Sequence, residues 1–196
     1  MHVRYAPHLL AALSLLRQSR AQDSIPSDLA GSFTSGGSFE IQCSYENDAA
    51  EGFADGTEFS EQETSQEPVF ALGDSTGVNT ALNFLILMVD TTCDNNRVLH
   101  YAQPGFQATG DRTQISADNG PAALDYQAPG SFGETGRHQY SFLLYFEPRG
   151  GSSFSVQGLP NEGEAFDVQE FQDANDLDDP RAGVAMVVDF GGSVDC

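Results

Sequence analysis

The sequence predicts a mainly β domain with a minor helical part. Stretches of strand length that are rich in apolar and aromatic residues recur along the chain, and only one segment carries the signals of a helix start. Strands and helices do not alternate in the rhythm of a parallel α/β sheet, so a β or α+β architecture is favoured. The 196 residues suit one domain that can bury a sizeable core.

Five segments are predicted to be strands. Residues 39–45 alternate apolar and polar side chains as a half-buried strand does. Residues 81–90 form a nearly unbroken apolar run, which is typical of a central strand buried on both faces; a short buried helix is the alternative that periodicity leaves open. The other three stretches are rich in aromatic and branched residues: 98–106, 140–147 and 184–190.

One helix is predicted close to the C-terminal end. Asp167 is placed as its N-cap, with Glu170 three residues later, and Phe166 and Phe171 occupy the two positions of a hydrophobic staple. Between the strand candidates lies a long segment rich in glycine, asparagine and proline, residues 107–133. A loop of this length in a compact domain is expected to have a function or a local fold.

The first residues are predicted to direct export. Arg4, the apolar stretch from Leu9 to Leu16 and the small residue Ala21 have the order of a signal peptide, residues 1–21. An uncleaved anchor is the alternative, although the apolar stretch is too short to span a bilayer. Residues 22–37 are rich in serine, glycine and aspartate and are predicted to be a flexible leader, followed by the folded domain, residues 38–196. We therefore expect a secreted, extracellular protein.

The charge of the chain argues against several classes of function. All eight basic residues are arginines, against 29 acidic residues, for a net charge of −21. Three arginines and no acidic residue lie in residues 1–21, so cleavage there would take the net charge to −24. Such a surface repels phosphate backbones and anionic lipids, which disfavours nucleic-acid and membrane-surface binding. Without lysine, neither Schiff-base chemistry nor a phosphate-loop lysine is available, and no cofactor is predicted.

Three cysteines are expected to give one disulfide and one further thiol in an oxidising compartment. Cys43, Cys93 and Cys196 allow three pairings, and the sequence does not choose among them. Because Cys196 is the last residue printed, a chain that continues further is another explanation for the odd cysteine.

Two motifs suggest chemistry that their surroundings do not support. Residues 73–77 fit the G-x-S-x-G pattern of serine hydrolases, which would make Ser75 a nucleophile. The residues that follow lead into an apolar strand and lack the helical period that this motif needs, so a polar turn is favoured. Residues 173–180 lack the ligand spacing of a calcium loop, and no cysteine or histidine pair has zinc spacing. No catalytic residue and no metal ligand is predicted.

A candidate anion site is centred on His138 and Tyr140. They are two residues apart at the start of a predicted strand and therefore share one face. The glycine-rich residues 128–136 can bring backbone N–H groups close to a ligand. The alternative is an edge histidine that is satisfied by a backbone carbonyl.

The order of features resembles the phosphatidylethanolamine-binding protein family over residues 39–190. The matching motifs are an apolar strand ending in Asp90, a strand with His100, a loop and strand from Tyr126 to Tyr140, and a helix start at Phe166. The resemblance implies a large central β-sheet packed on a smaller sheet, with short helices towards the C-terminal end. It also implies a non-enzymatic protein whose pocket binds small anions such as phosphate or a phospholipid headgroup.

Carried over by position, the resemblance places Asp90, His100, His138 and Tyr140 around that pocket. Asp90 would favour a charged imidazole, the two histidines would donate to the anion, and Tyr140 would add a hydroxyl group. Three positions depart from the family pattern: Thr92 replaces an aspartate, Asp94 a proline and Gln139 an arginine. A disulfide at Cys93 would be a replacement staple for this loop.

Three functions follow as hypotheses. The first is a secreted binding protein with a small anion pocket. The second is an inhibitor of an extracellular protease, such as a serine carboxypeptidase, or an interaction module with a degenerate pocket, in which the acidic surface or the leader contacts the partner. The third is a hydrolase acting through Ser75.

Overall fold

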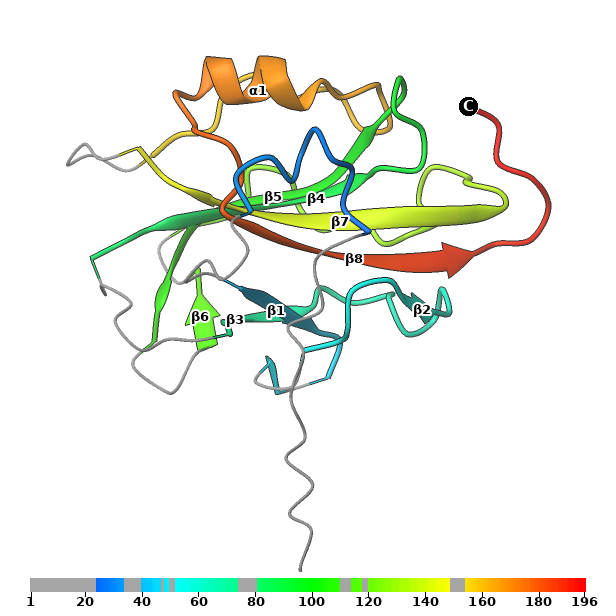
Figure 1. Ribbon diagram of the computed structural model, residues 1–196, viewed down its shortest axis with the longest axis horizontal. Helices are drawn as coiled ribbons and strands as arrows, with labels where there is room; N and C mark the ends of the chain where they lie inside the picture. Colours follow the sequence, from blue (N-terminus) through cyan, green and yellow to red (C-terminus); the bar gives the residue numbers. More distant parts are fainter. Residues whose placement is uncertain are drawn as a thin grey trace, which may run out of the picture.

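Eight strands and one helix make up the part of the chain that the computed structural model describes (Figure 1). That part comprises residues 24–33, 40–46, 48–49, 52–73, 81–109, 114–117, 120–148 and 154–196. The predicted signal peptide and Ser75 lie outside it. The elements are β1 (Ile41–Ser44), β2 (Thr57–Phe59), β3 (Val69–Leu72), β4 (Phe84–Asp90), β5 (Val98–Ala108), β6 (Gln114–Ser116), β7 (Arg137–Phe146), α1 (Val168–Ala174) and β8 (Ala182–Asp189).

The strands form one curled, mixed sheet in the order β1-β3-β6-β5-β4-β7-β8-β2. The strands β5, β4, β7 and β8 are antiparallel to their neighbours and form the large half, and the short β2 lies parallel to β8. β5 continues far enough to pair with β6 as well, so the smaller half, β1-β3-β6, stays hydrogen-bonded to the large one while it packs beneath it (Figure 1). The predicted pair of a large and a small sheet is confirmed, although β5 joins them.

The centre of the sheet is β4, and both of its faces are buried. Phe84, Ile86 and Met88 pack in the core between the two halves of the sheet. The alternate residues, Leu85 and Leu87, belong to a second core on the opposite face. All seven residues of β4 are buried, which explains the unbroken apolar run and settles residues 84–90 as a strand.

The second core is closed by α1 and by residues 24–33, which lie over the large half of the sheet (Figure 1). Ile25 and Leu29 are buried there. Asp28 forms an ion pair with Arg97, with 2.8 Å between Asp28 Oδ2 and Arg97 Nη1. This part of the segment 22–37 is therefore packed and not a flexible leader, because two apolar side chains and an ion pair fix it to the sheet.

The predicted helix is confirmed in place and in its start. The side chain of Asp167 accepts a hydrogen bond from the Glu170 amide at 3.0 Å. The rings of Phe166 and Phe171 lie 5.3 Å apart, as a staple requires. The helix is short, and it is the only one in the ranges given above; none there has the length and apolar character to span a membrane.

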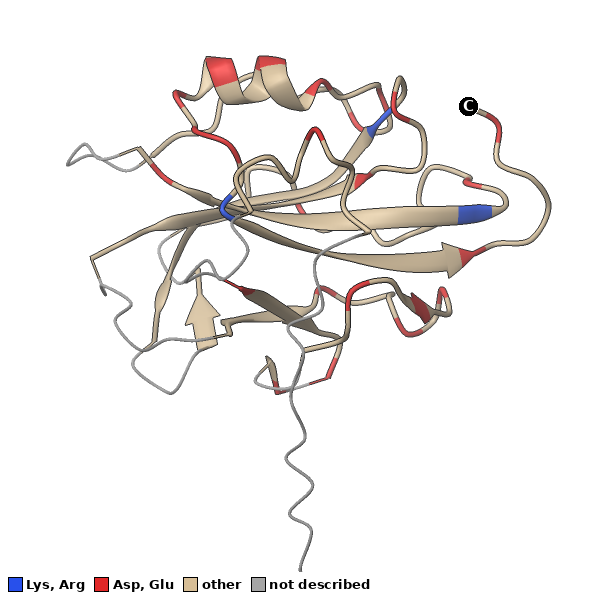
Figure 2. Ribbon diagram, in the orientation of Figure 1, with Lys and Arg blue, Asp and Glu red and all other residues tan. Residues whose placement is uncertain are grey.

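Acidic residues lie on α1, in the loops and in several strands, while the arginines are few and widely separated (Figure 2). Each of the three arginines of the described part pairs with a carboxylate: Arg97 with Asp28, Arg137 with Glu58, and Arg181 with Asp178. No described arginine is therefore left to offset the surrounding negative charge.

Candidate functional site

Four predicted residues and one unpredicted residue meet at one end of the adjacent strands β5, β4 and β7. Asp90 ends β4 and lies opposite Tyr140 on β7, His138 is two residues before Tyr140, and His100 lies on β5. The fifth residue is Glu134, from the loop that precedes β7. We refer to Asp90, His100, Glu134, His138 and Tyr140 as the polar cluster. The register of three adjacent strands thus brings together residues up to 50 positions apart in the sequence.

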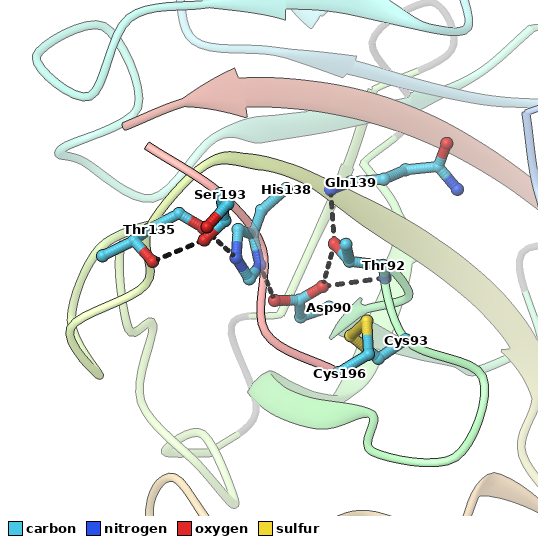
Figure 3. Close-up of a disulfide and its surroundings, with 8 residues drawn as sticks. All are labelled: Asp90, Thr92, Cys93, Thr135, His138, Gln139, Ser193 and Cys196. Carbon is cyan, nitrogen blue, oxygen red and sulfur yellow. Dashed lines mark hydrogen bonds and ion pairs between the residues drawn. A yellow bond between two sulfur atoms is a disulfide. The ribbon is translucent and has the colours of Figure 1, made fainter. Parts of the chain in front are cut away.

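His138 is bound at both ring nitrogens. Its Nδ1 donates to Oδ2 of Asp90 at 2.6 Å, and its Nε2 donates to the carbonyl oxygen of Thr135 at 3.1 Å (Figure 3). Both ring nitrogens are therefore engaged by groups of the protein. Asp90 therefore orients the ring. Neither nitrogen of His138 points at a free ligand position, although the family resemblance implied that His138 would donate to an anion.

His100 is completely buried and bound at one nitrogen only. Its Nδ1 donates to the carbonyl oxygen of Gln127 at 3.0 Å. Burial lowers the pKa of His100, because removal from water disfavours the charged ring. Nε2 makes no hydrogen bond within the described part of the chain, although Oε1 of Glu134 lies 3.4 Å from it.

The carboxylate of Glu134 lies inside the polar cluster and is held there by three donors. The Tyr140 hydroxyl donates to Oε1 at 3.2 Å, the Gly130 amide donates to Oε1 at 3.3 Å, and the Phe132 amide donates to Oε2 at 2.8 Å. Its side chain is 7% exposed. Burial raises the pKa of Tyr140, which keeps its hydroxyl a donor. The protein thus places its own anion next to His100.

The departures from the family pattern have structural roles. Oγ1 of Thr92 donates to Oδ1 of Asp90 at 2.6 Å (Figure 3). Oγ1 of Thr92 also accepts a hydrogen bond from the Gln139 amide at 2.8 Å. The Gln139 side chain donates to the Ser24 carbonyl at 2.6 Å and so helps to fix residues 24–33. Asp94 lies apart from the polar cluster, with its carboxylate 3.8 Å from Arg97.

The C-terminal tail, residues 190–196, covers the His138 side of the cluster. A disulfide between Cys93 and Cys196 fixes its end near Asp90, which leaves Cys43 as a buried free thiol (Figure 3). The tail also accepts a hydrogen bond at the Ser193 carbonyl from Thr135 Oγ1, at 2.9 Å. The structure thereby selects one of the three cysteine pairings, and the predicted staple at Cys93 ties down the chain end.

A surface hollow of about 510 Å³ borders the loop that holds Glu134. Two groups of residues line it: Ser60, Glu61, Gln62 and Ser65 on one part of the chain, and Ala128, Pro129, Gly130 and Ser131 on the other. Gly130 has φ +92°, and a Cβ there would lie 3.0 Å from the Phe190 ring, so a glycine is needed. Gly130, whose amide binds Glu134, is therefore also one of the residues that line the hollow.

The sequence located four members of the cluster and missed the fifth. Asp90, His100, His138 and Tyr140 were expected around an anion pocket, and the structure brings them together. Glu134 was expected only as part of a glycine-rich loop. Its position four residues before His138, beside glycines that supply amides, was the available signal, but no spacing rule shows that its side chain turns inwards.

No family model matches the chain, and no curated protein matches it in sequence. Solved structures do. Carboxypeptidase Y inhibitor, in complex with its cognate proteinase, is similar with a TM-score of 0.59 at 20% identity, covering 78% of this chain and 84% of that one. A phosphatidylethanolamine-binding protein from Plasmodium falciparum is similar with a TM-score of 0.50 at 15% identity, covering 80% of this chain and 88% of that one. One from Plasmodium vivax has a TM-score of 0.54 at 13% identity and covers 77% of this chain and 85% of that one.

The chain therefore has the fold of the phosphatidylethanolamine-binding proteins. Within that fold it carries a polar cluster of two histidines, a tyrosine and two carboxylates, one of which comes from the loop before β7.

Proposed function

We propose that this protein is a secreted, non-enzymatic binding protein whose polar cluster binds a small oxyanion in the place that the Glu134 carboxylate takes. The observation that carries the proposal is the set of donors around that carboxylate: the Tyr140 hydroxyl and the amides of Gly130 and Phe132. Donors in this arrangement suit a phosphate group or a carboxylate equally well.

Binding in this proposal requires the loop before β7 to turn Glu134 outwards. A buried carboxylate and an incoming anion cannot share the site, because two like charges in a poorly solvated space repel each other strongly. With Glu134 outside, Nε2 of His100 would have to carry a proton to donate to the anion. The hollow beside residues 128–131 gives the ligand a route to this loop.

The test compares the wild type with Glu134→Ala. Each protein is titrated with inorganic phosphate and with phosphoethanolamine at neutral pH, and the imidazole resonances of His100 and His138 are followed by NMR. We expect Glu134→Ala to bind phosphate at least about tenfold more tightly, because the internal competitor is gone. Glu164→Ala is the control, since it removes the same charge from an exposed position. Phosphate that shifts neither histidine in either protein would end the proposal.

A second candidate is inhibition of an extracellular protease, which the similarity in fold to carboxypeptidase Y inhibitor favours. A surface with net charge −21 would assist the approach of a partner with a positive patch. The test is hydrolysis by carboxypeptidase Y in the presence of increasing amounts of the purified protein. Stoichiometric inhibition would support this candidate, and full activity at a large excess would reject it.

Export is supported by the order of the first residues and by the disulfide, since disulfides persist in oxidising compartments. The test is the N-terminal sequence of protein recovered from the culture medium of an expressing eukaryotic cell. A mature chain starting close to Gln22 is expected, and retention of residues 1–21 inside the cell would contradict export.

A further inference from the structure

The free nitrogen of His100 is the starting point. Its Nδ1 must carry a proton, because its partner, the Gln127 carbonyl, can only accept. In the neutral ring, Nε2 is then a bare lone pair, buried and without a hydrogen-bond donor among the described residues. The atom that it faces, Oε1 of Glu134 at 3.4 Å, also carries lone pairs. Two electron-rich atoms that face each other in a buried space need a proton or a metal cation between them.

A third electron-rich group completes the arrangement. One ligand atom each from Asp90, His100 and Glu134 lies within 4.8 Å of the others. A small closure of the three side chains would bring these atoms to the separations found around an ion that is bound at about 2.0 to 2.2 Å. The three residues come from the end of β4, from β5 and from the loop before β7, so the strand register fixes two of them.

The partners of these three residues are those that orient metal ligands in known sites. Metal-binding histidines donate their other N–H group to a carbonyl or carboxylate, as His100 does to Gln127. Asp90 accepts from His138 and from Thr92, and Glu134 accepts from the Phe132 amide. Oε1 of Glu134 also accepts long hydrogen bonds from the Tyr140 hydroxyl and the Gly130 amide, at 3.2 Å and 3.3 Å. Each proposed ligand is therefore already held in place, and Nε2 of His100 keeps a lone pair that no donor among the described residues occupies.

We propose that Asp90, His100 and Glu134 bind a divalent transition-metal ion, with zinc as the reference. One imidazole and two carboxylates suit zinc, manganese or iron better than calcium, which takes six to eight oxygen ligands. Two carboxylates with little exposure, those of Asp90 and Glu134, also favour a bound cation. This inference does not rest on the proposed anion binding, since it needs Glu134 turned inwards and anion binding needs it turned outwards. The metal ion is therefore expected to oppose anion binding.

The experiment uses the full-length protein after treatment with a chelator. Zinc is titrated by isothermal calorimetry, and the imidazole nitrogens are followed by NMR. We expect one zinc ion to bind tightly per chain. The NMR resonance of His100 Nε2 should shift strongly, and His100 Nδ1 should keep its proton. Glu134→Gln and Asp90→Asn should each lower the affinity for zinc by at least about tenfold. Glu164→Gln is the control for surface charge and should leave it unchanged.

Three outcomes would overturn the proposal. The wild type could fail to bind zinc tightly, or zinc could bind without shifting the resonance of His100 Nε2. Glu134→Gln could also bind zinc as strongly as the control variant does. The shift of His100 is measured on the wild type, so an unstable variant does not decide the matter. Titrations with manganese and calcium distinguish the ion class, and calcium binding tighter than zinc would contradict it. Phosphate binding by Glu134→Ala, measured without metal, tests anion binding separately.

Discussion

The Glu134 carboxylate lies 3.4 Å from Nε2 of His100, in a space from which water is largely excluded. The two residues come from a loop and from β5, and each is held by hydrogen bonds from behind. A site with two histidines would ordinarily attract an anion, but here the protein supplies one itself. In the two proposals above, the direction of the Glu134 side chain sets whether the cluster binds an anion or a cation.

The hydroxyl group of Thr92 is expected to stabilise the cluster through Asp90. Thr92→Val removes the donor to Asp90 and leaves the Gln139 amide without its acceptor, so the free energy of unfolding should fall by about 1 to 3 kcal/mol. Urea denaturation measures this change. Thr92→Ser retains the hydroxyl and should lose much less. Equal losses in the two variants would show that the methyl group, and not the hydroxyl, is what matters.

Gly136 is expected to be required where the C-terminal tail crosses the loop before β7. Its φ is +83°, and a Cβ would lie 2.6 Å from the backbone nitrogen of Val194. Gly136→Ala should therefore destabilise the fold by about 1 to 3 kcal/mol beyond the cost of the backbone angle alone. Gly133→Ala is the matched control, since its φ is +80° and no atom lies within 4 Å of the added Cβ. If the two variants are equally stable, the tail does not pack as described.

The disulfide is expected to hold the tail over His138. It joins Cys93 to Cys196 across a sequence separation of 103, and its loss typically costs 2 to 5 kcal/mol. Replacing both cysteines with serine should lower the free energy of unfolding by about that amount. It should also speed hydrogen exchange at the Gly136 amide, which donates to the Gly191 carbonyl. A reducing agent should destabilise the wild type and leave the double variant unchanged; an effect on both would point to Cys43 instead.

The ion pair between Asp28 and Arg97 predicts an acid-sensitive attachment of residues 24–33. The hydrogen bond from Arg97 lowers the pKa of Asp28 below its ordinary value of 3.8. Its contribution to stability is therefore present above pH 3.8 and is lost as the pH falls through the lower, folded value. Asp28→Asn should flatten this part of the stability profile. Asp94→Asn is the control, because Asp94 lies 3.8 Å from Arg97 and is 83% exposed; an identical profile in both variants would contradict the prediction.

The four long strands of the large half were all predicted, and so was the short β1, which lies within the predicted residues 39–45. β4, β5, β7 and β8 carry long apolar or aromatic runs because both faces are covered. The strands that were missed are β2, β3 and β6, which have three or four residues each. Gln114–Ser116 has a single apolar residue, Ile115, and its strand character comes only from its pairing with β3 and β5. Such segments carry no periodicity that could reveal them.

The polar cluster was predictable as far as strand position determines it. Asp90, His100, His138 and Tyr140 lie on strands, so their faces follow from alternation and from the motif order of the family. Glu134 lies in a loop, and its direction depends on backbone angles at Gly130, Gly133 and Gly136, all with positive φ. Residues 24–33 were misjudged for a related reason: Ile25 and Leu29 are isolated apolar residues in a polar stretch, and only the completed sheet offers them a surface.

The most direct test of the inward position of Glu134 is the hydrogen exchange rate of the Phe132 amide. In the described part of the chain this amide donates to Oε2 of Glu134 at 2.8 Å, whereas the neighbouring Ser131 amide donates to the Ala128 carbonyl at 3.1 Å. We predict that the Phe132 amide is protected in the wild type and exchanges much faster in Glu134→Ala, while the Ser131 amide changes little. Exchange at Phe132 that is equally fast in both proteins would show that the carboxylate does not lie in the cluster.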